Sequence, residues 1–446
     1  MNTPIFDFVN QYIESHSHRL HMPGHKGINV LGCEAFDITE ISGADSLYEA
    51  SGIIKESETN AGRLFGCNTF YSAEGSSLCI RAMLHLALMY AKEKGFSKTI
   101  LAARNAHKTF LTGAMLLDLD VKWLYAHEES SYLTCNISPK ELEDAILDCE
   151  IKPMAVYITS PDYLGNRADI KELARICRKH HVLLLVDNAH GAYLKFLPES
   201  EHPMDLGADM CCDSAHKTLP VLTGGAYLHI SNSHTNDLSA YAKDAMALFG
   251  STSPSYLILQ SLDLANRYLS ESFAKDLKLT AERISALKET LSNNGYSLCG
   301  NEHLKLTIKT KDYGYTGYEL AEILQRKNIY CEFADPDYAV FMFTPIGGND
   351  SIDALEKVLL DIPEKEPVTT TPPTLIQGEV VMSPAAAMMC AKETVFVADS
   401  CGRILASPSV SCPPAVPVVV CGERISPQAV KLFEYYGITT CCVTKE

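Results

Sequence analysis

The chain has 446 residues, of which 55 are acidic and 38 are lysine or arginine, so its formal charge is −17. Hydrophobic residues make up 46%, which excludes disorder as the main state. The acidic balance argues against a nucleic-acid partner, because a phosphate-binding surface needs clustered lysine and arginine. The length predicts two or three domains.

Sixteen cysteines are present, none of them spaced as C-x-x-C. This usage is typical of reduced thiols in a cytoplasmic protein. The first residues lack the basic and apolar segments of a signal peptide. No apolar run approaches the ~20 residues that span a bilayer. We therefore expect a cytoplasmic protein without a membrane partner.

In chain order, apolar residues at helical spacing predict a short helix within residues 1–30, ended by a loop around His21–His25. From about residue 75 to 230, periodic stretches alternate with short apolar runs. This alternation predicts an α/β fold with a mostly parallel sheet. The predicted helices are 76–94 and 170–180, and the predicted strands are 98–103, 154–159, 182–186 and 225–230.

A second α/β segment is expected over residues 271–362. A stretch rich in proline, threonine and glutamate follows and predicts a linker over 363–374. A separate C-terminal segment, 375–446, contains strand-like runs at 395–398 and 416–420. Within the second segment the predicted helices are 278–294, 318–327 and 351–362, and the predicted strands are 304–308 and 338–343.

The central chemical signal is the run from Asp213 to Thr218, which contains Lys217 and precedes Gly224-Gly225 and a strand. A lysine that forms a Schiff base must lose its proton part of the time, which partial burial and nearby cations favour. Ser214 and His216 are well placed to contact an anionic group such as a cofactor phosphate. An ordinary solvated loop lysine is the alternative.

A carboxylate ends the apolar run 182–186 at Asp187. Ligands of doubly wound sheets bind outside the carboxyl ends of the strands, where Asp187 is expected. An aspartate there suits pyridoxal phosphate, because it pairs with the pyridine nitrogen and keeps it protonated. The alternative is an aspartate that caps the next loop.

Two weaker signals precede these. Ser76 and Ser77 open the predicted helix 76–94, and a helix N-terminus stabilises phosphate, although serine caps are common. His107 follows the strand 98–103 and is a candidate for stacking on a flat cofactor, although a polar loop histidine is the alternative.

Together, these features occur in the order phosphate loop, stacking histidine, ring-nitrogen aspartate and Schiff-base lysine. The sequence resembles the ornithine/lysine/arginine decarboxylase family of fold type I pyridoxal-phosphate enzymes, in its shorter bacterial form. The resemblance runs nearly end to end. It includes the motifs at residues 21–27, 57–66, 159–165, 251–256, 411–417 and 421–423.

The resemblance implies an aspartate aminotransferase-like fold and a division into five segments. It implies that Lys217 forms the Schiff base, that Asp187 holds the pyridine nitrogen with His190 beside it, and that His107 stacks on the ring. The segments are an N-terminal arm (1–30), a large cofactor domain (31–270), a small α/β domain (271–362), the linker (363–374) and a C-terminal domain (375–446). The implied phosphate contacts are Ser76, Ser77, Ser214 and His216, and the residues implied to reach a partner subunit's site are Ser251, Thr252 and Ser253.

Three motifs depart from the family pattern. The strand-end motif reads Asp-Asn-Ala-His, with Asn188 where glutamate is common. The phosphate loop reads Glu-Gly-Ser-Ser from Glu74, where asparagine usually stands first. The tail reads Pro-Pro-Ala-Val-Pro in place of Pro-Pro-Gly-Ile-Pro. None removes a chemical essential, but each bears on substrate preference.

The expected reaction is decarboxylation of arginine, lysine or ornithine by at least a homodimer. Asp162 and Glu423 are candidates to bind the distal cation of the substrate. The alternatives are a pyridoxal-phosphate aminotransferase, with Arg267 or Arg326 gripping the substrate carboxylate, and a non-catalytic cofactor-binding protein. No metal is expected. The histidines His18, His21 and His25 lack a cysteine or carboxylate at ligand spacing.

Overall fold

The computed structural model describes residues 1–125, 131–232, 238–374, 377–408 and 416–445. The chain divides into two compact units. The first contains Met1–Lys98, Ile151–Tyr157 and Ile170–Leu277, and the second contains Thr99–Glu150, Ile158–Asp169 and Lys278–Glu446. This division groups residues 99–150 with the C-terminal half, whereas the sequence-based boundaries, which stay predictions, placed them in the large domain.

The first unit is built on strands in the order β1-β7-β6-β5-β4. β5 and β6 pair in parallel, whereas β7 runs antiparallel to both β6 and β1. The chain reverses between β6 and β7 because that connection holds only one helical turn, α8 (Ala215–Thr218). The strands are β1 (Asn68–Ser72), β4 (Ala155–Thr159), β5 (Leu183–Asp187), β6 (Met210–Asp213) and β7 (Ala226–Ile230).

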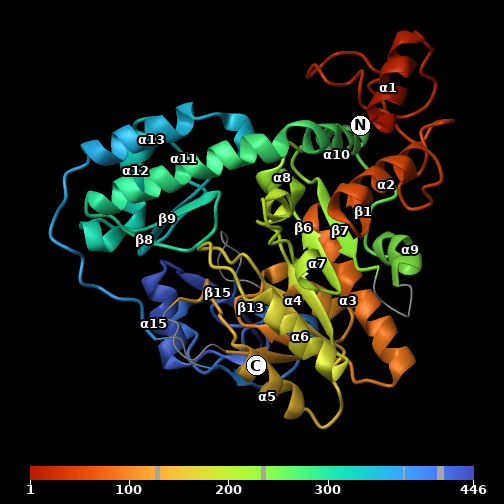
Figure 1. Ribbon diagram of the computed structural model, residues 1–446. Coiled ribbons are helices and arrows are strands. Elements are labelled where there is room, and N and C mark those ends of the chain that lie inside the picture. The colour runs from red at the N-terminus through yellow and green to blue at the C-terminus, as the bar shows by residue number, and fades with distance from the viewer. Residues whose placement is uncertain (126–130, 233–237, 375–376, 409–415, 446) are drawn as a thin grey trace. The chain divides into compact units, whose positions relative to one another are not determined.

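The helix α3 (Gly75–Lys94) packs against β1, β5, β6 and β7 of this unit (Figure 1). It confirms the predicted helix 76–94 and ends at Gly95, whose φ of +72° suits glycine. The other helices here are α1 (Pro4–Glu14), α2 (Ile53–Phe65), α6 (Ile170–His180), α7 (Pro203–Leu206), α9 (Ala242–Ala247) and α10 (Tyr256–Glu271), and α11 (Phe273–Asn293) continues into the second unit.

The second unit begins with an α/β segment in which β2 and β3 pair in parallel. It also holds an antiparallel sheet in the order β10-β11-β9-β8. The elements are β2 (Thr99–Ala103), α4 (Lys108–Leu116), β3 (Asp120–Leu124), α5 (Pro139–Leu147), β8 (Ser297–Cys299), β9 (Lys305–Lys309), α12 (Gly317–Gln325), β10 (Phe333–Ala334), β11 (Tyr338–Met342) and α13 (Asp350–Asp361).

The C-terminal segment contributes two short antiparallel strand pairs, β12 with β14 and β13 with β15. Its side chains share a buried cluster that includes Leu405, Ile425, Phe433 and Val443. Residues 363–374 before it contain no helix or strand. The elements are β12 (Glu379–Val380), α14 (Pro384–Met389), β13 (Lys392–Phe396), β14 (Glu423–Arg424), α15 (Pro427–Tyr435) and β15 (Thr440–Thr444).

The strand predicted at residues 416–420 is wrong, because these residues form a buried irregular segment. Arg104 donates hydrogen bonds to the carbonyl oxygens of Pro417 (2.8 Å) and Val418 (3.0 Å). A guanidinium therefore satisfies the carbonyl groups that a neighbouring strand would otherwise bind. The strand predicted at 395–398 lies earlier, as β13. Residues 411–415 of the tail motif lie outside the described residues.

None of the helices in the described ranges is long and apolar enough to cross a membrane.

Candidate functional site

Lys217 lies on the helical turn α8 and is half-buried. Its Nζ lies 2.8 Å from Nε2 of His190, which is 5% exposed. Nδ1 of His216 lies 3.0 Å from the carbonyl oxygen of Gly225, directly before β7. The structure thus brings together the predicted lysine and the predicted histidine from two different loops. An imidazole in contact with a lysine amine is suited to exchange a proton with it.

Asp187 ends β5 with 2% of its surface exposed. Its Oδ2 accepts a hydrogen bond from the Tyr157 hydroxyl (3.0 Å), and its Oδ1 accepts one from the backbone N–H of Ala189 (3.2 Å). Burial raises the pKa of Tyr157 well above its usual value, so this hydroxyl stays a donor. A carboxylate has about four acceptor positions, so Asp187 can accept a further hydrogen bond from a ring N–H.

The N-terminus of α3 brings two predicted phosphate contacts together. Oγ of Ser214 donates to Oγ of Ser76 at 2.8 Å. The N-cap residue Glu74 makes no side-chain cap, and the first turn of a helix favours an anion. Two hydroxyl groups at an uncapped N-terminus fit the phosphate of pyridoxal phosphate.

Glu74 instead accepts a hydrogen bond from the backbone N–H of Ser251 at 2.6 Å. This contact places the start of the exposed segment Ser251–Ser253 beside the phosphate loop of the same chain. The sequence-based role of this segment in a partner subunit's site stays a prediction.

His107 belongs to the second unit and caps α4. Its Nδ1 accepts a hydrogen bond from the backbone N–H of Thr109 at 3.2 Å and lies 3.0 Å from the Thr109 hydroxyl. These contacts orient the ring. Its stacking on a cofactor stays a prediction.

Asp162, a candidate for the distal cation of the substrate, is 5% exposed. Oδ1 and Oδ2 accept hydrogen bonds from the backbone N–H and side-chain amide of Asn166, both at 2.8 Å. This bonding is typical of an aspartate that stabilises a turn. Its role toward a substrate stays a prediction.

Glu423, the other candidate, is 2% exposed and pairs with Arg104 at 3.5 Å. Its Oε2 also accepts a hydrogen bond from the backbone N–H of Val420 at 2.7 Å. The same guanidinium binds two carbonyl groups of the buried segment 416–420. Glu423 and Arg104 therefore hold the C-terminal segment together.

Replacing Glu423 by glutamine is expected to lower the free energy of unfolding by about 2 kcal/mol, because it leaves the partly buried Arg104 guanidinium without its counter-charge. Urea unfolding measures the loss. The KM for a basic amino acid is expected to stay within about threefold, since Oε2 is held by Arg104 and by the backbone N–H of Val420, although Oε1 has no hydrogen-bond partner. Glu379→Gln, which removes an exposed carboxylate that pairs with Arg424, is the matched control. A tenfold rise in KM with unchanged stability would contradict this view and favour substrate binding.

Burial and the neighbouring charge of Asp337 raise the pKa of Asp335 to about 7, although the backbone N–H groups of Asp337 and Tyr338 oppose the shift. Asp335 is 3% exposed, and its Oδ2 has no hydrogen-bond partner. The folded-state pKa lies above the unfolded value near 4. The carboxyl group therefore stabilises the fold fully below about pH 4, and this contribution is lost as the pH rises through about 7.

Asp335→Asn is expected to remove this pH dependence. Between pH 5 and 7 the wild-type free energy of unfolding should fall by up to about 1.4 kcal/mol per pH unit more than that of the variant. Urea titrations of both proteins at pH 5, 6 and 7 measure the difference, in which groups common to both cancel. Parallel curves for the two proteins would show that Asp335 is ionised throughout this range.

Two of the N-terminal histidines raised as metal candidates have separate partners, as His21 contacts Tyr12 and His25 contacts Asp37. A different set comes together among the described residues. The ligand atoms of His202, Cys211, Asp213 and His229, all buried, lie within 4.8 Å of one another. Sequence reasoning missed this cluster. Its only local signal is Cys211 and Asp213 at the two-residue spacing of one strand face.

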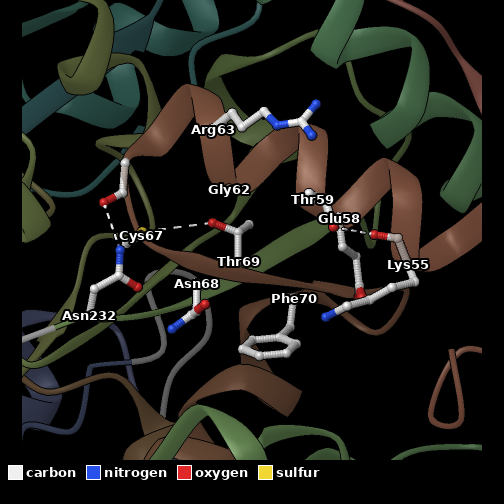
Figure 2. Close-up of a pocket in the computed structure, with 11 residues that line it drawn as sticks. Lys55, Glu58, Thr59, Gly62, Arg63, Cys67, Asn68, Thr69, Phe70 and Asn232 are labelled. Carbon is white, nitrogen blue, oxygen red and sulfur yellow. Dashed lines mark hydrogen bonds between the residues drawn. The ribbon is translucent and has the colours of Figure 1, made fainter. Parts of the chain in front are cut away.

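A hollow of about 350 Å³ lies on α2 and β1 (Figure 2). Its lining includes Lys55, Glu58 and Arg63, but none of the residues predicted for the cofactor. Cys67 and Thr69 line it and also contact the ring of His229, at 3.6 Å and 2.9 Å.

The fold matches solved structures of lysine decarboxylases. The structure of the Escherichia coli constitutive lysine decarboxylase superposes with a TM-score of 0.78 at 17% identity, covering 100% of this chain and 82% of that one. This likeness confirms the predicted α/β fold class.

Residues 3–306 match the family described as "Orn/Lys/Arg decarboxylase, major domain", and residues 372–443 match "Orn/Lys/Arg decarboxylase, C-terminal domain". The chain belongs to the Orn/Lys/Arg decarboxylase family. It is 31% identical to the Bacillus subtilis protein YaaO, over 97% of this chain and 93% of that protein. It is 28% identical to an arginine decarboxylase of Halalkalibacterium halodurans, over 95% and 91%.

Proposed function

We propose that the protein is a pyridoxal-phosphate-dependent decarboxylase of a basic amino acid, which releases carbon dioxide and agmatine, cadaverine or putrescine. The observation that carries the proposal is the contact between Lys217 and His190 at 2.8 Å. His190 follows three residues after Asp187, which lies at the carboxyl end of β5. Family membership supports the reaction class.

Pyridoxal phosphate supplies an electron sink for the pair of electrons left when the bond from Cα to the carboxylate breaks. Lys217 would hold it covalently, and Asp187 would accept a hydrogen bond from its protonated ring nitrogen. Ser76 and Ser214 would bind the phosphate together with Ser77 and His216. His107 would lie against the ring face.

Lys217 and His190 are the two groups suited to return a proton to Cα after carbon dioxide has left. Their contact means that the amine and the imidazole can share that proton. The buried hydroxyl of Tyr157 keeps Asp187 oriented, because it donates to Oδ2 and leaves that oxygen one further acceptor position.

Arginine is the first substrate to test, because two relatives that match over 91% of their own length are arginine decarboxylases. Lysine and ornithine remain within the family description. We propose a cytoplasmic homodimer in which Ser251, Thr252 and Ser253 reach the neighbouring site. Of the two candidates for the distal cation, Asp162 accepts hydrogen bonds from Asn166 and Glu423 pairs with Arg104, and for Glu423 we expect a structural role.

The test is to incubate the protein and pyridoxal phosphate with arginine, lysine or ornithine, and to record carbon dioxide and amine products by chromatography. One dominant amine is the expected result. A visible band of bound cofactor with no carbon dioxide from any of the three would refute the proposal. Transfer of the amino group to a keto acid would then identify an aminotransferase.

A further inference from the structure

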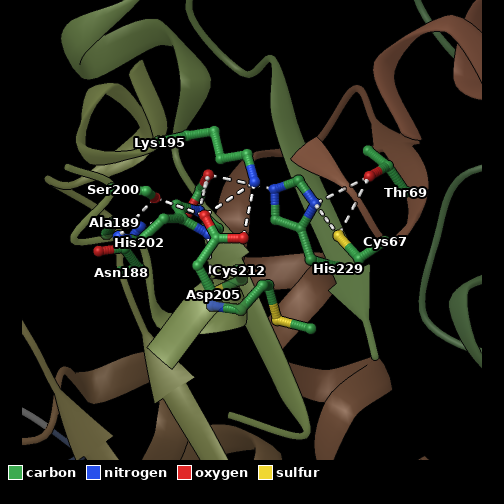
Figure 3. Close-up of polar contacts among 12 residues, drawn as sticks. Cys67, Thr69, Asn188, Ala189, Lys195, Ser200, His202, Asp205, Cys212 and His229 are labelled. Atoms are coloured by element: carbon green, nitrogen blue, oxygen red, sulfur yellow. Dashed lines mark hydrogen bonds and ion pairs between the residues drawn. The ribbon is translucent and has the colours of Figure 1, made fainter. Parts of the chain in front are cut away.

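A buried cluster of hydrogen bonds surrounds Asp213, the residue that ends β6 directly before Ser214. Asp213 has no exposed surface. Its Oδ2 accepts hydrogen bonds from Nε2 of His202 (3.0 Å) and Nε2 of His229 (3.1 Å), and its Oδ1 accepts one from the side-chain amide of Asn188 (2.7 Å). Figure 3 shows the surroundings of both rings and of Asn188. Asn188 is the residue that departs from the common strand-end motif.

The sheet register explains this convergence. Cys211 and Asp213 lie on the same face of β6, because side chains alternate along a strand. His229 of β7 pairs with Cys211, and Thr69 of β1 pairs with His229. Cys212 lies on the opposite face and pairs with Asp187. Asp213 therefore faces away from Asp187.

Asn188 joins the ends of β5 and β6. Its backbone N–H donates to the carbonyl oxygen of Cys212 at 3.0 Å, while its side-chain amide donates to Asp213. Space around the side chain is closed, since a Cβ at Gly191 would lie 2.0 Å from Oδ1 of Asn188. The loop that carries Asp187 and His190 is thus attached to the turn that carries Lys217.

Two imidazoles, a thiol and a carboxylate are also a ligand set for zinc. The hydrogen bonds argue against a metal here. Both Nε2 atoms face a carboxylate and must carry the proton that they donate. Nδ1 of His202 accepts from the backbone N–H of Met204 at 3.4 Å, which leaves that proton on Nε2. A protonated ring nitrogen has no lone pair for a metal.

We propose that Asn188 and Asp213 are positioning residues, whose side-chain hydrogen bond fixes the separation between the carboxylate of Asp187 and the amine of Lys217. This inference rests on the proposed function. It explains why an amide stands at position 188. A second carboxylate there would face Asp213 without a proton donor between them, and buried like charges repel.

The test compares Asn188→Asp, Asp213→Asn and the double variant that exchanges the two side chains. In the double variant the amide at 213 donates to the carboxylate at 188, and the carbonyl oxygen at 213 accepts from the imidazoles, so the donor and acceptor pattern survives. Asn188→Asp should lower kcat by about 10- to 100-fold and change KM by less than about threefold. Adding Asp213→Asn should return kcat to within about threefold of wild type.

Three further readouts separate positioning from folding and from the proposed function. The melting temperature, the dissociation constant for pyridoxal phosphate and the pH midpoint of the visible band of the bound cofactor are measured on all four proteins. We expect Asn188→Asp to shift the band and to weaken cofactor binding. The double variant should restore both the band and the binding. If the wild type releases no carbon dioxide, the proposed function fails, and these shifts still test the pair. A wild-type kcat and band in Asn188→Asp, or an exchange that restores nothing, would overturn the inference.

Discussion

Replacing Lys217 by alanine is expected to abolish carbon dioxide release, lowering kcat by at least about 1,000-fold. The variant loses both the amine that would hold the cofactor covalently and the group that shares a proton with His190. Chromatography of the amine product with saturating pyridoxal phosphate measures the loss. The visible absorption band of the lysine-bound cofactor should also disappear.

Lys278→Ala is the matched control, because Lys278 lies on α11 with 65% of its side chain exposed and pairs only distantly with Glu282 at 3.9 Å. This control should keep wild-type activity and the visible band. Carbon dioxide release from the Lys217 variant at a rate near that of the control would show that another group carries the chemistry. A Lys217 variant that keeps its cellular role without activity would support a non-catalytic protein.

Replacing Asp187 by asparagine is expected to lower kcat by about 100-fold or more. An amide cannot hold the ring nitrogen of the cofactor in its protonated form, so the electron sink weakens. The variant should still fold, since asparagine matches aspartate in size, although its single oxygen cannot accept the hydrogen bonds of both Tyr157 and Ala189. Steady-state kinetics and the dissociation constant for pyridoxal phosphate measure both effects.

Tyr157→Phe is the graded companion of this variant. It removes one hydrogen bond to Asp187 and leaves the carboxylate in place, so the loss in kcat should stay within about tenfold. A Tyr157→Phe effect as large as that of Asp187→Asn would mean that the hydroxyl itself takes part in the reaction. A kcat of the Asp187→Asn variant within threefold of wild type would exclude the proposed role of Asp187 in binding the ring nitrogen of the cofactor.

Elements with strong local patterns were predicted well. The helix 76–94 is observed as α3 (Gly75–Lys94), and the apolar run 182–186 is observed as β5 (Leu183–Asp187). Both elements carry their buried apolar residues in a local pattern, helical spacing in one and a continuous run in the other, which is visible in the sequence. β1 and β6 were missed, because Asn68–Ser72 and Met210–Asp213 are short and carry polar residues.

The run 416–420 shows the opposite error. Its valines are buried as expected, but a strand needs a neighbouring strand to bind its carbonyl groups. Arg104, more than 300 residues away in the sequence, binds two of them instead. Apolar composition indicates burial and does not identify the hydrogen-bond partner.

The sequence by itself determined the family and the fold class, because motifs such as that around Lys217 are local and the alternation of helices and strands can be read along the chain. Only the tertiary structure decided the environment of Asn188 and Asp213. Their hydrogen bond, and those of Asp213 with His202 and His229, depend on strand register and on the position of His202 at the start of α7. No local periodicity records such pairings, because register is set by contacts between distant segments.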